Sequence, residues 1–77
     1  MKIATLVCIT EGEVNGDVQT FDISTTEGRE KAISAWKERI REVYDTDSEH
    51  AILAGILNEY DYHNGTDSFI LFFGEME

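Results

Sequence analysis

The chain has 77 residues, of which 16 are acidic and six are basic, and its formal net charge is −10. This length predicts a single domain covering residues 1–77, and a hydrophobic content of 42% predicts a packed core rather than a disordered acidic tail. So large a negative charge argues against direct binding to nucleic acid or to an anionic membrane, since few bases are left to contact phosphate.

The first strand is expected at residues 2–10, where apolar side chains fall on both faces. A strand of this kind is central in its sheet, or its second face is covered by a partner. Asn15-Gly16 signals a hairpin turn, because both residues tolerate positive φ. Residues 17–23 then form a more polar returning strand at the edge of the sheet.

The longest periodic signal is an amphipathic helix over residues 24–44. Ser24 and Glu27 have the spacing of a capping box, with Thr25 and Thr26 as alternative caps. Apolar residues recur at helical spacing on one face: Ala32, Ile33, Trp36, Ile40, Val43 and Tyr44. We therefore expect Trp36, at the centre of this face, to anchor the core.

Residues 52–62 fit two interpretations. Their apolar spacing and a cap at Ser48 fit a second helix, whereas Gly55 in mid-helix costs about 1 kcal/mol relative to alanine. Residues 60–62 also alternate like a strand, and we interpret the segment as mainly strand. Asn64-Gly65 signals a second hairpin, which leads into a buried strand at residues 69–73.

These elements predict a small α+β domain in which one long amphipathic helix packs on one face of an antiparallel β-sheet. The expected order is ββαββ, and the alternative is ββααβ, with three strands and two helices. In the first arrangement the second face of the sheet keeps apolar and aromatic residues exposed. Such a face favours a homodimer.

No motif predicts catalysis or a cofactor. Residues 45–49 begin like a calcium-binding loop, but His50 and Ile56 stand where that loop needs a glycine and a bidentate glutamate. Neither His50 nor His63 has a second histidine or a cysteine at the spacing of a zinc site. Cys8 lies in an apolar run, which is typical of a buried, unreactive thiol. We therefore expect a protein that is not an enzyme, with no catalytic residues, no bound metal and no cofactor.

Compartment follows from the same composition. One cysteine cannot form an internal disulfide, which fits a reducing environment. The apolar stretch at the N-terminus is too short for a signal peptide or for a membrane span. We therefore expect a cytoplasmic protein.

Charge is unevenly distributed along the chain. Residues 27–44 hold five of the six bases and four of the 16 acids, so the rest has one base against twelve acids, a net charge of −11. We hypothesise an inhibitor whose carboxylates imitate the phosphates of a duplex and occupy a basic, nucleic-acid-binding surface of another protein. Small acidic phage proteins directed against host nucleases have a similar composition. The candidate partner-binding residues are Glu11, Glu13, Asp17, Asp22, Asp45, Asp47, Glu49, Glu59, Asp61 and Asp67.

The alternative hypothesis is a structural or regulatory domain that associates with itself, its acidity serving only solubility. Its affinity would come from aromatic residues assigned to the free face of the sheet, and salt would change it little. Those residues are Phe69, Phe72, Phe73, Tyr60 and Tyr62.

Overall fold

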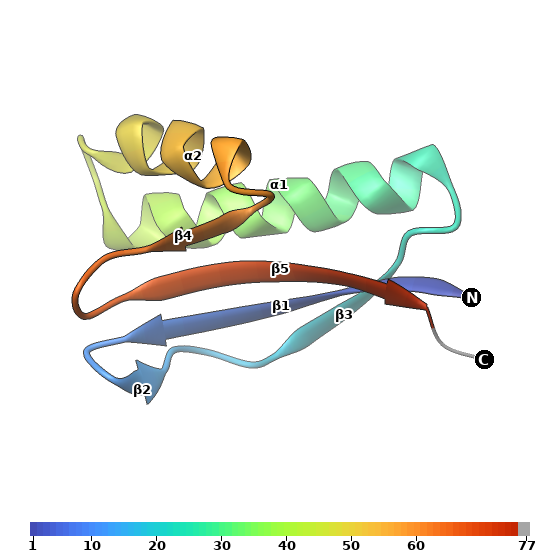
Figure 1. Cartoon of the computed structure of the whole chain (residues 1–77), viewed down its shortest axis with the longest axis horizontal. Coiled ribbons are helices and arrows are strands. Elements are labelled where there is room, and N and C mark those ends of the chain that lie inside the picture. Colours follow the sequence, from blue (N-terminus) through green and yellow to red (C-terminus); the bar gives the residue numbers. More distant parts are fainter. Residues whose placement is uncertain (76–77) are drawn as a thin grey trace.

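A computed structural model describes residues 1–75 of the chain. Its elements are β1 (Lys2–Thr10), β2 (Glu13–Val14), β3 (Gln19–Asp22), α1 (Thr26–Val43), α2 (Ser48–Leu57), β4 (Asp61–His63) and β5 (Ser68–Glu75). Helix α1 packs against β1, β3 and β5, and α2 packs against α1 and β4 (Figure 1). The predicted class, an α+β domain with a long helix on an antiparallel sheet, is confirmed.

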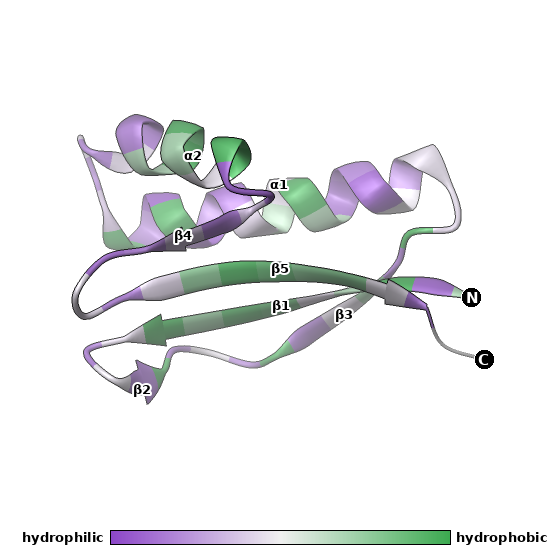
Figure 2. Ribbon diagram, viewed as in Figure 1, coloured by the Kyte–Doolittle hydropathy of each residue, from purple (hydrophilic) through white to green (hydrophobic). Residues whose placement is uncertain are grey.

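The sheet is organised around β1 and β5. They pair antiparallel over eight residues, with Leu6 opposite Leu71, and β4 pairs with the other side of β5. Both β2 and β3 pair with the outer side of β1, one after the other. Figure 2 shows the consequence, since the two central strands are the most hydrophobic and β4 is hydrophilic. The expectation of a central first strand is therefore correct.

The first hairpin turns earlier than predicted. Thr10 pairs with Glu13, so the turn is Glu11-Gly12, both at positive φ (52° and 82°). Asn15 instead continues the pairing, because its N–H donates to the Cys8 carbonyl at 2.7 Å. Gly16, at φ 78°, forms the break between β2 and β3. The returning strand consequently covers only Gln19–Asp22 rather than residues 17–23.

Helix α1 matches its predicted length closely, but its cap is Thr25 rather than Ser24. The Thr25 hydroxyl accepts from the Gly28 N–H at 3.1 Å, which satisfies one free amide of the first turn. The Ser24 N–H donates to Asp22 instead. The helix ends at Val43, one residue before the predicted end, and its buried residues are Ala32, Trp36 and Ile40.

The interpretation of residues 52–62 as mainly strand was wrong. Helix α2 continues to Leu57, and only Asp61–His63 is strand. The alternative arrangement, ββααβ, correctly included two helices, but its three-stranded sheet had no strand corresponding to β4. Gly55 is the residue that misled the sequence argument, because its lack of a Cβ is needed for packing: the Trp36 indole occupies the space. Packing therefore outweighs the intrinsic cost of glycine in the helix.

The core lies between the helices and the inner face of the sheet. Its largest fully buried side chains are Trp36, Phe69, Leu6, Ile40 and Leu71. Trp36 anchors this core as expected, with its Nε1–H donating to the Phe69 carbonyl at 3.0 Å. Cys8 is a buried free thiol, and burial raises its pKa.

The opposite, outer face of the sheet has no helix over it among residues 1–75. Strand alternation and register place these side chains there: Ile3, Thr5, Val7, Ile9, Ile70 and Phe72. Phe72 is 54% exposed. The other aromatic residues assigned to this face lie on the helix side: Phe69 is in the core, Tyr60 contacts Trp36 and Phe73, and Tyr62 contacts Tyr44. That part of the prediction was wrong.

Candidate partner-binding surface

Three connections meet at one end of the molecule, on the left in Figure 1: the β1–β2 turn, the α1–α2 loop and the β4–β5 turn. Asp67 joins them, because its carboxylate accepts from the Glu11 N–H at 3.1 Å and from the Tyr44 hydroxyl. Asn64 Nδ2 donates to the same hydroxyl at 2.8 Å. Besides Asp67, four acids lie in or next to these connections, in a region that we call the acidic end: Glu11, Glu13, Asp45 and Asp47.

Asp67 is itself unlike the exposed acids. It is 9% exposed, and the hydrogen bond from Tyr44 holds the pKa of its carboxyl below the usual range. Burial, together with that same hydrogen bond, raises the pKa of Tyr44 to about 12. Each group therefore keeps its partner in the required form, with Asp67 ionised and Tyr44 protonated. The Asp67 carboxylate therefore holds the three connections together.

Most of the remaining candidate acids are free. Nine exposed carboxylates within residues 1–75 have neither an ion pair nor a side-chain hydrogen bond, and six of them are candidates: Glu11, Glu13, Asp17, Asp45, Asp47 and Glu59. The other three are Glu27, Glu30 and Glu75. The six candidates project from turns and short connections of a folded domain, so their charges are directed at solvent.

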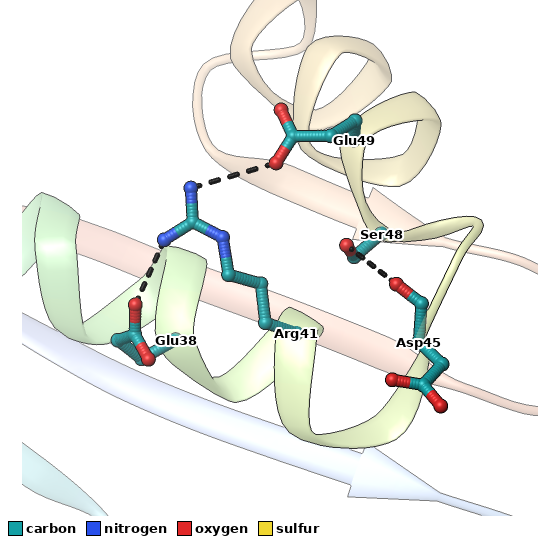
Figure 3. Close-up of polar contacts among 5 residues, drawn as sticks. All are labelled: Glu38, Arg41, Asp45, Ser48 and Glu49. Atoms are coloured by element: carbon teal, nitrogen blue, oxygen red, sulfur yellow. Dashed lines mark hydrogen bonds and ion pairs between the residues drawn. The ribbon is translucent and has the colours of Figure 1, made fainter.

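Two other candidates have local structural partners. Asp22 accepts from the Ser24 N–H at 2.9 Å, and this hydrogen bond lowers the pKa of its carboxyl. Glu49 lies 3.5 Å from Arg41 Nη2, while Arg41 Nη1 is 2.8 Å from Glu38 (Figure 3). Arg41 thus bridges α1 and α2. Figure 3 also shows Ser48 donating to the Asp45 carbonyl, which fixes the loop between the helices.

Asp61 and Glu59 lie at the connection from α2 to β4. Glu59 and Tyr60 both have positive φ, 56° and 62°, which turns the chain sharply into the strand. Asp61 Oδ1 is buried without a hydrogen-bond partner among the described residues, and His63 Nδ1 is 3.5 Å away. Beside this connection lies a groove of about 350 Å³ lined by Asn58, Glu59, Asp61 and Ile70 to Phe73. Sequence reasoning did not identify this groove, because it depends on β4 pairing with only the first three residues of β5.

The arginines are engaged within the domain. Arg39 Nη2 donates to the Asn15 carbonyl at 3.3 Å, and its Nη1 is 3.5 Å from Glu42. The Arg29 guanidinium lies over the Phe73 ring, 5.1 Å from its centroid. With Arg41 bridging two glutamates, every arginine on α1 has an intramolecular partner. The charge outside α1 is therefore left largely uncompensated.

Among residues 1–75, no group of three or more His, Cys, Asp or Glu side chains is arranged to hold a metal ion. Over the same residues, no helix combines the length and the apolar character needed to cross a membrane. Comparison of the chain with family models, with curated proteins and with solved structures finds no match.

Proposed function

We propose that the protein is a non-enzymatic acidic interaction module that inhibits another cytoplasmic protein by occupying its basic, nucleic-acid-binding surface. The observation that carries this proposal is that six of the ten candidate acids are exposed carboxylates without a side-chain partner within residues 1–75, while the arginines of α1 already have intramolecular partners. A basic partner surface supplies the missing positive charges. A nucleic-acid-binding surface is the natural candidate, since it is built to receive closely spaced anions.

The acidic end supports charge mimicry through its fixed geometry. Its three connections are held together by the hydrogen bonds of Asp67, so their carboxylates keep their spacing before a partner arrives. Such preorganisation reduces the entropy lost on binding. Exposed charges act mainly on the rate of association and are screened by salt, so binding should weaken as ionic strength rises.

The experiment is competition with DNA. Purified nucleases and DNA-binding proteins are loaded with a fluorescent duplex, and the protein is titrated in at low and high salt. Displacement at low salt is expected, and Asp45→Asn with Asp47→Asn should weaken it by about tenfold. The matched control is Glu27→Gln with Glu30→Gln, which removes the same charge from α1. Equal loss in both variants, or no displacement of any duplex, would contradict the proposal.

A second candidate function is self-association through the outer face of the sheet. The observation that favours it is the uncovered apolar band of β1 and β5, with Phe72 54% exposed. Sedimentation of the pure protein should then show a dimer at both low and high salt, and Phe72→Glu should dissociate it. A monomer at all concentrations contradicts this second function.

A further inference from the structure

Strand β5 has one edge that is only half used. It runs from Ser68 to Glu75, but β4 pairs with only three of its residues, Ser68 to Ile70. Figure 1 shows β5 continuing beyond the point where the chain turns away into α2. The sharp turn at Glu59-Tyr60, with both residues at positive φ, is what ends the pairing. Among the described residues, the far half of β5 therefore borders no strand on that side.

The backbone groups at this edge can be identified individually. Leu71 donates its N–H to the Tyr60 carbonyl at 3.0 Å, so odd-numbered residues of β5 point their backbone groups toward the β4 side. Tyr60 donates its own N–H to Gly55 instead, at 2.7 Å, and so leaves the Leu71 carbonyl without that bond. Phe73, two residues on, pairs with Ala4 of β1 but has no strand on its β4 side within residues 1–75. The N–H and C=O of Phe73 accordingly point away from β1, toward the side on which the groove lies.

The groove of about 350 Å³ lies along this edge, since Leu71, Phe72 and Phe73 form one of its walls. Its other wall carries two carboxylates, Glu59 and Asp61. The Asp61 Oδ1 atom has no hydrogen bond among the described residues. The site thus combines unpaired strand backbone, an exposed aromatic ring and acceptors for positive charge.

Charge selects the occupant of this edge. A second copy of the chain pairing edge to edge would bring its own Glu59, Asp61 and Glu75 toward the same carboxylates, and like charges opposite one another destabilise a sheet. A basic segment meets the opposite situation, because its side chains would pair with these acids while its backbone completes the ladder.

We propose that a basic polypeptide segment in extended conformation adds as a strand to the free edge of β5, opposite Phe73. This inference rests on the proposed function, in that it assigns the basic partner a place and a conformation. The added strand lies beside β5 on the same side as β4, next to the residues of β5 that β4 does not pair with. Its cationic side chains face Glu59 and Asp61.

The test uses a labelled eight-residue peptide of alternating lysine and valine, with a glutamate–valine peptide as control. Binding to the full chain is measured by fluorescence anisotropy, and hydrogen exchange of the Phe73 amide is followed by NMR. The decisive pair of variants is Phe73→Pro and Phe73→Ala. Both lose the ring, but only proline also removes the N–H at the free edge, and the β1 ladder uses the even-numbered residues of β5.

The expected result is that the lysine peptide binds, slows exchange of the Phe73 amide and loses about tenfold in affinity with Phe73→Pro relative to Phe73→Ala. Equal affinity of the two variants, or an unprotected Phe73 amide at saturation, overturns strand addition while leaving the proposed function standing. Equal binding of the lysine and glutamate peptides would show no preference for positive charge, and would overturn both strand addition and the proposed function. No binding of the lysine peptide overturns the inference, as does a dimer that protects the Phe73 amide without peptide.

Discussion

The indole of Trp36 packs against Gly55, joining the middle of α1 to the last turn of α2. A Cβ built at Gly55 would come within 2.3 Å of Trp36 Cζ2 and 3.1 Å of Tyr62 Cβ. Trp36 is fully buried, hydrogen-bonded to Phe69 and in edge-to-face contact with Tyr60 at 5.4 Å. The ring therefore has little room to move away from a larger residue.

Gly55→Ala should consequently destabilise the protein. Alanine improves helix propensity by about 1 kcal/mol, but overpacking of a rigid core typically costs about 1–3 kcal/mol and the helices must separate. Urea unfolding measures the difference. Gly65→Ala is the matched control, because no atom lies within 4 Å of its added Cβ, and it should change stability by less than about 0.5 kcal/mol. A Gly55→Ala variant more stable than the wild type would show that the Trp36 indole can move to accommodate the added methyl group.

This contact also shows why the sequence could predict α1 but not α2. The amphipathic period of α1 is local and long, so its face and its anchor, Trp36, follow from spacing alone. The helical state of residues 48–57 depends on a partner 19 positions away, since Gly55 is favourable only where an indole packs against it. Helix propensity considered by itself treats Gly55 as unfavourable, and so it disfavoured a helix at residues 48–57.

The positions of the turns and of the candidate site were also hard to predict, because they depend on contacts between residues distant in the sequence. Asn15-Gly16 and Glu11-Gly12 both supply residues able to adopt positive φ, and the choice between them is made by contacts across the fold. Arg39 packs against Gly16, where a Cβ would lie 1.9 Å from its Nη2 atom. Composition identified the acids of the surface, but it did not reveal that Asp67 is buried or that the edge of β5 is open. Both facts arise from strand pairing.

Asp67→Asn should lower the free energy of unfolding by about 1–3 kcal/mol, the usual cost of losing hydrogen bonds to a buried charged group. An amide can accept from one of the Tyr44 and Glu11 donors, but its NH₂ then faces the other. Asp47→Asn is the control, since this carboxylate is exposed and has no partner in the described structure. Thermal unfolding at neutral pH separates the two variants, and equal effects would contradict the structural role of Asp67.

The same pair gives a prediction at acid pH. The folded-state pKa of Asp67 is lowered, so its stabilisation is fully present above the unfolded value of about 4 and is lost as pH falls through the folded pKa. The stability difference between wild type and Asp67→Asn should therefore shrink below about pH 4. Urea unfolding at a series of pH values tests this, and a constant difference would show that the charge is not involved.

Tyr44 predicts the opposite behaviour at alkaline pH. Its folded-state pKa is raised to about 12, chiefly by burial, so its stabilisation is complete below the unfolded pKa of about 10 and is lost between about pH 10 and 12. Tyrosinate absorbance should show a late step in the wild type that is missing in Tyr44→Phe. A difference titration with its step near pH 10 would mean that the hydroxyl is freely solvated.

Arg41 offers a test of what the charges between the helices contribute. It bridges Glu38 on α1 and Glu49 on α2 while remaining partly exposed, so Arg41→Gln should cost less than about 1 kcal/mol at low salt. Salt at about 1 M should erase that cost, because the Debye length falls to about 3 Å. Lys31→Gln is the charge-matched control, because Lys31 lies on the same helix and has no ion pair among the described residues. A larger loss that persists in high salt would mean that the Arg41 stem stabilises the two helices by packing, not by its charge.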